Sequence, residues 1–223
     1  MTTNGRDEKI RSAYDKSQMI MKQVNKNAYR FEKYVGPDRW ASYWHQLREV
    51  LLVLPSSVLE IGVGDGVFGD HLKSHGVAYT SVDIAEDLSP DVVADVTALP
   101  FPDESFDVVC AFEILEHVPF EGFDEALREL SRVSKRHVII SLPHFGPSIR
   151  FELKIPLVPR VRFAWKVPYP KRHRFNGEHY WEVGKRGFSV RRIRNALSSL
   201  FAIAKEFVPF ENQYHRFFVL IKK

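Results

Sequence analysis

The stretch from residue 58 to residue 66, with the sequence VLEIGVGDG, constrains the fold of this chain more than any other. A short apolar run leads directly into a turn that holds three glycines. Glycine has no Cβ, so a ligand can approach the backbone of such a turn closely. The stretch therefore predicts a strand followed by a ligand-binding turn.

The residues around this stretch predict a parallel α/β sheet. Strands are expected at 58–61, 79–82, 92–94, 106–111 and 137–142, with helices at 67–74 and 123–133 between them. A helix at 190–200 capped by Ser189, and strands at 201–208 and 216–221, follow. Strands that alternate with helices imply right-handed crossovers and a doubly wound sheet with helices on both faces.

Two segments fall outside this alternation, within what we interpret as a single domain over residues 1–223. Residues 1–54 predict an N-terminal helical lid, in which Asp38 caps a helix at 39–52. Residues 144–187 are rich in proline, aromatic residues and positive charge, and predict an ordered insertion over the active rim. The core then spans 55–143, and 188–223 closes the sheet.

Composition limits the class of protein. The chain is 44% hydrophobic and 27% charged, which is typical of a folded globular protein and not of a disordered one. A single cysteine, Cys110, and a polar N-terminus predict a cytoplasmic location. The longest aliphatic run, residues 50–54, is far shorter than the ~20 residues that span a bilayer.

The positive charge of the chain belongs to one segment. Residues 150–174 hold eight lysines or arginines and one glutamate, whereas the formal net charge of the whole chain is only +4. The segment could hold an anionic small or lipid-linked substrate, contact an anionic membrane surface, or follow nucleic acid through phosphate contacts and stacking. A solvated positive face without a partner is the remaining interpretation.

The glycine turn by itself fits two kinds of ligand. The pattern Gly64-x-Gly66-x-x-Gly69 matches a dinucleotide-binding fingerprint, but this register places Glu60 well inside the strand, where an unpaired carboxylate is costly. A turn that starts at Gly62 leaves Glu60 near the strand end. An acidic group there suits a cationic ligand better than a pyrophosphate.

Four motifs, VLEIGVGDG, SVDI, DVTALPFPDESFDVV and AFEILEHV, occur in this order in the stretch from residue 58 to about 142. In this order they closely resemble the class I S-adenosylmethionine-dependent methyltransferases, particularly the small-molecule branch called type 11. The resemblance implies a seven-stranded, mostly parallel Rossmann-like sheet, S-adenosylmethionine as cofactor, and methyl transfer as the activity.

The resemblance also implies which residues of the glycine turn hold the cofactor. Gly62, Val63 and Gly64 would pass under the methionine part of S-adenosylmethionine. Glu60 would lie near its ammonium end or orient the turn.

The other implied cofactor residues follow later strands. Asp83 would accept hydrogen bonds from both ribose hydroxyls, and Ile84 would pack on the adenine. Asp95 would bond the adenine amino group, Val96 would offer a backbone N–H to the ring, and Phe112 would line the pocket. The alternative for both aspartates is a role as turn or cap residues.

Positioning supplies most of the rate of methyl transfer, but a hydroxyl acceptor would benefit from a general base. His144, just beyond the fifth strand, and His179, in the basic insertion, are the favoured catalytic candidates. His117 and His173 are further candidates, and a structural role is the alternative for each histidine.

Glu113, Glu116 and His117 have the spacing of side chains on one helical face, which suits a metal site. This ExxEH pattern is similar to that of the small-RNA 2'-O-methyltransferases and of some ubiquinone-pathway O-methyltransferases, which use a divalent ion there; His179 would be the distant ligand. Because EILEHV is also common among metal-free relatives, the sequence favours a structural role and no metal is assigned.

These observations predict a methyltransferase that modifies oxygen on a small or lipid-linked anionic molecule, with peripheral membrane contact through residues 150–174. Three alternatives remain open. An RNA methyltransferase would use the basic segment, a module that binds the cofactor without turnover would need no base, and a dehydrogenase would use the glycine fingerprint.

Overall fold

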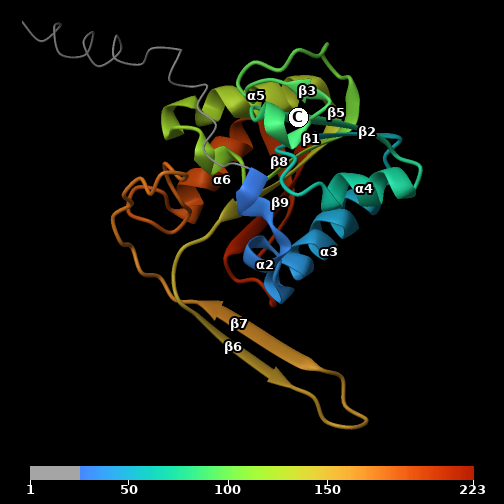
Figure 1. The fold of residues 1–223 in the computed structure, drawn as a ribbon. Coiled ribbons are helices and arrows are strands. Elements are labelled where there is room, and N and C mark those ends of the chain that lie inside the picture. Colours follow the sequence, from blue (N-terminus) through green and yellow to red (C-terminus); the bar gives the residue numbers. More distant parts are fainter. Residues whose placement is uncertain (1–25) are drawn as a thin grey trace, which may run out of the picture.

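The computed structural model describes residues 26–223, so residues 1–25 of the predicted N-terminal lid lie outside the described residues. Its centre is a seven-stranded sheet in the order β3-β2-β1-β4-β5-β9-β8 (Figure 1). The strands are β1 (Ser57–Ile61), β2 (Ala78–Asp83), β3 (Val92–Val93), β4 (Phe106–Phe112), β5 (Ser134–Pro143), β8 (Phe201–Phe207) and β9 (His215–Lys222). The first five are parallel, and β9 runs antiparallel to both β5 and β8. The predicted doubly wound, mostly parallel sheet is confirmed.

The helices cover the two faces of this sheet (Figure 1). The α-helices are α2 (Phe31–Tyr34), α3 (Pro37–Leu51), α4 (Val67–Ser74), α5 (Phe123–Val133) and α6 (Val190–Leu200). The 3₁₀ turns are η2 (Lys26–Tyr29), η3 (Glu86–Leu88), η4 (Leu115–His117) and η5 (Phe120–Gly122). None of the helices within residues 26–223 combines the length and the apolar character needed to cross a membrane.

Alternate residues of β1 enter two separate cores because strand side chains alternate between faces. Leu59 and Ile61 pack in the core that contains α5 and α6. Val58 packs in the core that contains α3 and α4. Burial on both faces explains why the strands read as nearly continuous apolar runs in the sequence.

The register of the central strands brings their carboxyl ends to one edge. Ile61 pairs with both Val82 and Ala111, so β1, β2 and β4 end together. The next residue, Gly62, donates its amide to the carbonyl of Val82 at 2.7 Å. The glycine turn therefore begins at the edge where a parallel sheet binds its ligands.

The start of α3 differs from the sequence prediction. The helix begins at Pro37 with Gly36 at the N-cap position, and no side chain caps it, so the prediction that Asp38 is the cap was wrong. Proline suits the first helical position because its φ angle is already helical and its missing N–H would have no partner there. The predicted cap of α6 is confirmed, because Ser189 accepts from the amide of Arg192 at 3.2 Å.

The insertion after β5 has two parts. Its first part is an antiparallel hairpin of β6 (Ser148–Leu153) and β7 (Val161–Lys166), which extends away from the body (Figure 1). Its last part returns to the core, where Trp181 is fully buried and donates its indole N–H to the carbonyl of Val118 at 3.0 Å. The sequence predicted one insertion over the rim, but it did not anticipate that the hairpin would project from it.

The burial of Trp181 predicts a large effect on stability. Trp181→Ala should lower the free energy of unfolding by about 3–5 kcal/mol, because it leaves a cavity and removes a buried hydrogen bond. Urea unfolding followed by circular dichroism measures this change. Trp165→Ala, at an exposed tryptophan of β7, is the matched control and should change it by less than about 0.5 kcal/mol. Equal losses of unfolding free energy in the two variants would show that the burial of Trp181 does not stabilise the fold.

Candidate active site

The glycine turn adopts a backbone that other residues rarely accept. Gly62, Gly64 and Gly66 have φ angles of 85°, 58° and 81°, in the left-handed region. A Cβ at Gly62 would lie 2.0 Å from the side chain of Ile114. Ile114 was not among the predicted site residues, because only the folded chain brings the end of β4 against this turn.

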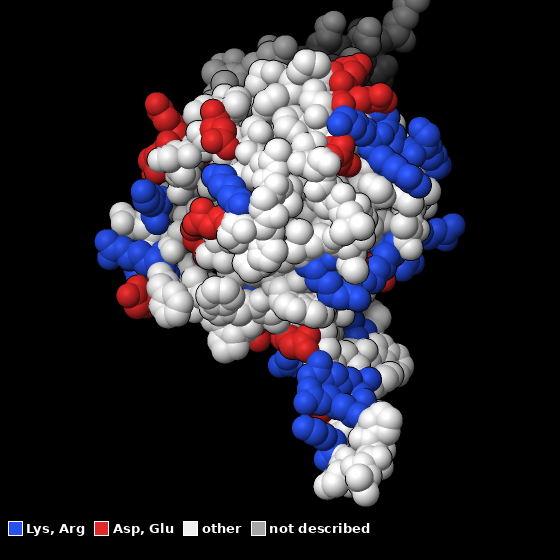
Figure 2. Space-filling view, turned by 90° about the vertical axis from the view of Figure 1, so that its right-hand side faces the viewer, with Lys and Arg blue, Asp and Glu red and all other residues white. Residues whose placement is uncertain are grey.

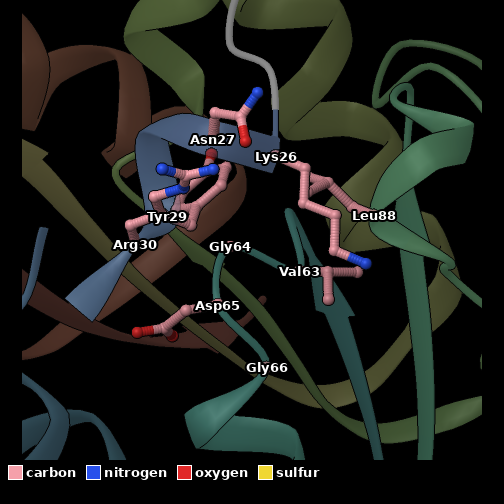
Figure 3. A pocket seen from close by; sticks show the side chains of 9 residues that line it. All are labelled: Lys26, Asn27, Tyr29, Arg30, Val63, Gly64, Asp65, Gly66 and Leu88. Carbon is pink, nitrogen blue, oxygen red and sulfur yellow. The ribbon is translucent and has the colours of Figure 1, made fainter.

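A cavity of about 460 Å³ lies over the turn (Figure 3). The turn forms one side of it through Val63, Gly64, Asp65 and Gly66. The other side of the cavity comes from two segments. Lys26, Asn27, Tyr29 and Arg30 lie in or next to η2, and Leu88 lies in η3. The described end of the N-terminal lid thus lies over the glycine turn.

Asp83 connects the turn to the neighbouring strand. Its Oδ2 accepts from the amide of Val63 at 2.9 Å, and its Oδ1 accepts from the amide of Ala85 at 2.8 Å. Each carboxylate oxygen has two lone pairs, so further donors can still bind. The carboxylate is held at the end of β2, beside the glycine turn.

Asp95 and its neighbour lie after β3. Asp95 Oδ1 accepts from the amide of Thr97 at 2.8 Å and from its hydroxyl at 2.7 Å. Val96 is buried in the core beside α5, and Ile84 is half-buried after β2. Asp95 therefore acts as a turn residue, which was the alternative to a cofactor contact. Both of these contacts use Oδ1, and neither uses Oδ2.

Glu60 and Phe112 face the side of the sheet that α3 and α4 cover. Glu60 is buried and accepts a hydrogen bond from the hydroxyl of Tyr79, and burial raises the pKa of its carboxyl to about 8. Phe112 packs edge to face on Phe68 of α4, with ring centroids 5.2 Å apart. Sequence reasoning missed Tyr79, which is 19 residues from Glu60 and has the apolar neighbours of an ordinary strand residue.

His144 and His179 occupy different places. His144 is buried and its Nδ1 accepts from Arg216 Nε at 3.1 Å, while burial and the Arg216 charge lower its pKa to about 3. It lines a second cavity of about 500 Å³ with Lys166 and Tyr169. The bond from Arg216 occupies the lone pair at Nδ1, which makes His144 a poor general base.

His179 lies in a cluster with Glu116 and His117. One ligand atom from each residue lies within 4.8 Å of the others. The distance from His179 Nε2 to Glu116 Oε1 is 3.9 Å. These residues do not share one helical face, as the spacing suggested. Glu113 lies before η4 with a φ of 55°, and His179 lies in the part of the insertion that returns to the core.

Three of the four carboxyl oxygens of Glu113 and Glu116 are buried without a hydrogen-bond partner among the described residues, namely both oxygens of Glu116 and Glu113 Oε1. Glu113 Oε2, in contrast, lies 3.6 Å from His215 Nε2. Burial raises the pKa of Glu113 to about 8, and burial and the Glu113 charge raise the pKa of Glu116. Burial and the neighbouring His179 lower the pKa of His117 to about 4. Carboxylate oxygens and neutral imidazoles are donors that suit a divalent cation, so these residues fit one.

Tyr34 links the cluster to the glycine turn. Its hydroxyl lies 4.0 Å from the position that a Cβ of Gly64 would take. The pKa of Tyr34 is raised to about 12 mainly by burial, with contributions from the charges of Asp65, Glu113 and Glu116 despite the opposing effect of Arg39. The side chain of Ile114, the residue after Glu113, lies 2.0 Å from the position that a Cβ of Gly62 would take, so the acidic cluster adjoins the glycine turn.

Comparison with known proteins agrees with this geometry. The profile of a family described as a methyltransferase domain matches residues 59–142. A malonyl-[acyl-carrier protein] O-methyltransferase from Halorhodospira halophila (strain DSM 244 / SL1) is 31% identical over 156 residues, which cover 62% of this chain and 48% of that protein. The chain thus spans about half the length of this curated relative. The matched core, residues 59–142, is therefore similar to a methyltransferase domain, in agreement with the resemblance that the sequence motifs predicted.

Solved structures share the fold of this chain. The PH0226 protein from Pyrococcus horikoshii OT3 has a TM-score of 0.60 at 18% identity, over 90% of this chain and 100% of that one. The N-methyltransferase NodS from Bradyrhizobium japonicum WM9, in complex with S-adenosyl-L-homocysteine, has a TM-score of 0.60 at 12% identity, over 92% and 97%. These likenesses show that the chain has the Rossmann-like fold of solved methyltransferases.

The raised pKa of Glu60 predicts a pH dependence of stability. In the folded protein Glu60 holds its proton up to about pH 8, whereas its ordinary pKa is 4.5. Its contribution to stability is therefore full below pH 4.5 and is lost as the pH rises toward 8. Unfolding by urea across this range should show a smaller pH-dependent loss in Glu60→Gln than in the unchanged protein. Identical pH profiles would contradict the burial of a protonated Glu60.

Proposed function

We propose that this methyltransferase transfers the methyl group of S-adenosylmethionine to an oxygen atom of a small or lipid-linked anionic molecule. One observation carries the proposal: the left-handed glycine turn, fixed by Asp83, lies near a cluster of the fully buried Glu116 with the half-buried His117 and His179, and Glu113 lies beside it. The similarity to a malonyl-[acyl-carrier protein] O-methyltransferase supports oxygen as the acceptor atom. The buried Cys110, which forms no disulfide, is consistent with the cytoplasm as the proposed location.

In this proposal the cofactor occupies the cavity over the glycine turn. The backbone of residues 62–64 lies under its methionine part, and Asp83 accepts from the ribose hydroxyls. Ile84, Asp95 and Val96 surround the adenine. Glu60, near the end of β1 just before the turn, accepts from Tyr79, and in this proposal it orients the turn rather than contacting the cofactor.

A divalent cation at Glu116, His117 and His179, with Glu113 beside them, belongs to the same proposal. The orphaned buried oxygens of Glu116 support it, because an unpaired buried carboxylate is otherwise costly. Such a cation would act as a Lewis acid on the acceptor oxygen. His179 Nδ1 lies 3.4 Å from Glu182 Oε1, and this contact orients the ring with Nε2 toward Glu116.

We propose that the anionic part of the acceptor binds in the second cavity, which lies at the base of the hairpin. Its lining includes four cations, namely Lys166, Lys185, Arg186 and Arg216. Burial and the Arg216 charge lower the pKa of Lys166 to about 8, so an anion bound there would favour its charged form. His144 lines the same cavity and would contact the acceptor's anionic part rather than act as the base.

RNA as the acceptor has less support. Two of the arginines expected to follow phosphates already have acidic partners, because Arg160 pairs with Glu152 and Arg162 pairs with Glu152 and Glu211. Binding of RNA with a steep salt dependence would favour this second candidate.

Asp83→Ala should lower the affinity for S-adenosylmethionine roughly 100-fold, because it removes the charged acceptor of the ribose hydroxyls and loosens the turn at Val63. Isothermal titration calorimetry measures the affinity. Asp107→Ala is the matched control, because Asp107 accepts from the amides of Ser56 and Ser57 at the opposite end of β1. Unchanged binding by Asp83→Ala, or stabilisation by NAD in place of S-adenosylmethionine, would refute the proposed cofactor site.

The cation site predicts that the protein binds about one Mn²⁺ in the absence of any acceptor. Glu116→Gln should weaken this binding at least tenfold, because it replaces a charged ligand by a neutral one. Electron paramagnetic resonance of bound Mn²⁺ gives the affinity without an activity assay. Glu60→Gln changes a buried glutamate outside the cluster and should bind Mn²⁺ normally. Equal affinities of the two variants would show that the cluster does not hold the cation.

A further inference from the structure

The β6–β7 hairpin has one apolar and one polar face. Its register pairs apolar residues with each other, as Ile149 with Trp165, Phe151 with Phe163, and Leu153 with Val161. The residues between them form the other face and are mostly polar, including Arg150, Glu152, Arg162 and Lys166. The alternation follows from the two-residue period of a strand.

The polar face is attached to the body of the protein. Arg150 donates to the carbonyl of Glu211 at 2.9 Å, Arg162 pairs with the Glu211 carboxylate at 2.6 Å, and Lys166 donates to the carbonyl of Gln213 at 2.6 Å. The apolar face therefore points away from the body. The side chains of this face are exposed, with Trp165 and Ile149 each 61% accessible.

Exposed apolar residues concentrate on this one hairpin and its flank. Of the nineteen large hydrophobic residues that are exposed in the described part of the chain, eleven lie between residues 149 and 169. A two-stranded sheet is marginal in water, and an apolar patch of this kind marks an interaction site. The hairpin face therefore has the character of a docking surface.

The tip of the hairpin is apolar and carries basic residues around it. Residues 155–159 have the sequence IPLVP, between Lys154 and Arg160. Leu157 is fully exposed with a φ of 65°, so the turn holds it away from the chain. Figure 2 shows a projecting arm whose end is free of charged side chains, with Lys and Arg grouped behind it.

We propose that the β6–β7 hairpin inserts its tip and apolar face into an anionic membrane surface. Apolar and aromatic side chains enter the boundary between headgroups and acyl chains, and adjacent lysines and arginines are attracted to anionic lipid. Lys154 and Arg160 can extend their charged ends to the headgroups while their stems follow the tip.

Charge decides between a membrane and a second copy of the chain. Residues 148–167 contain five basic side chains and one glutamate. Two such hairpins face to face would bring like charges together, whereas an anionic lipid surface has the opposite sign. The inference places the second cavity, at the base of the hairpin, near the membrane surface, and it does not depend on methyl transfer or on the acceptor.

Sedimentation of the full chain with lipid vesicles tests the insertion. The protein should bind vesicles of phosphatidylcholine with phosphatidylglycerol and bind pure phosphatidylcholine more weakly. Leu157→Asn should weaken binding about tenfold, because it removes a large apolar side chain from the tip. Leu54→Asn is the matched control, because Leu54 is also exposed and also has a positive φ, of 52°, on the body of the protein. Asparagine tolerates this conformation, so both variants should fold.

A second pair of variants tests the charge. Lys154→Gln with Arg160→Gln should weaken binding to the anionic vesicles roughly 5- to 30-fold, since each free cation near the surface contributes about 1 kcal/mol and Arg160 is partly neutralised by Glu152, 3.2 Å away. Arg128→Gln with Arg136→Gln, at exposed positions of the body, should bind normally. Calorimetry with S-adenosylmethionine should be unchanged in all four variants, so a failure of the cofactor site and a failure of membrane docking can be told apart.

Three results would overturn the proposal. The first is no binding to either kind of vesicle. The second is equal binding by Leu157→Asn and Leu54→Asn, which would mean that charge alone attracts the protein and that the tip does not insert. The third is a dimer in analytical ultracentrifugation that Leu157→Asn dissociates, which would assign the apolar face to a second copy of the chain.

Discussion

The hydrogen bond from the amide of Val63 to Asp83 Oδ2 joins the two strand ends on which the rest of the site depends. It requires the parallel register of β1 and β2, which brings Gly62 beside Val82. It also requires a left-handed turn, because that conformation aims the amide of Val63 across the strand end. The turn below the cavity requires glycine, because any other residue at Gly62 or Gly64 would have to adopt a left-handed backbone that side chains disfavour.

The acidic cluster represents a second constraint of a different kind. Glu113 and Glu116 follow β4 directly, so the sheet that places the glycine turn also carries a half-buried and a fully buried carboxyl group to the same edge. Burial without hydrogen-bond partners destabilises a folded chain, so such a feature is typical of sites that serve function. The proposed cation would provide the missing opposite charge, and the donor atoms lie close enough to share it.

The predicted helices and strands agree with the structure where the sequence carries a local signal. The buried strands have continuous apolar runs, α4 ends before Gly76, and α6 begins after Ser189. The hairpin of β6 and β7 was not predicted, because its prolines and mixed charges resemble a loop and its apolar face packs on nothing in the body. Asp38 was wrongly assigned as a cap because Pro37, one residue earlier, could already start the helix.

The sequence by itself determined the glycine turn, the strand ends with Asp83 and Asp95, and the resemblance to methyltransferases, because these depend on short local patterns in a known order. Only the tertiary structure decided which distant residues meet. It placed His179 beside Glu116 and kept His144 apart with Arg216, although both histidines follow β5 in the chain. The physical reason is that the path of the insertion depends on the burial of Trp181 and on the contacts of the hairpin with the body, and neither has a signature in local sequence.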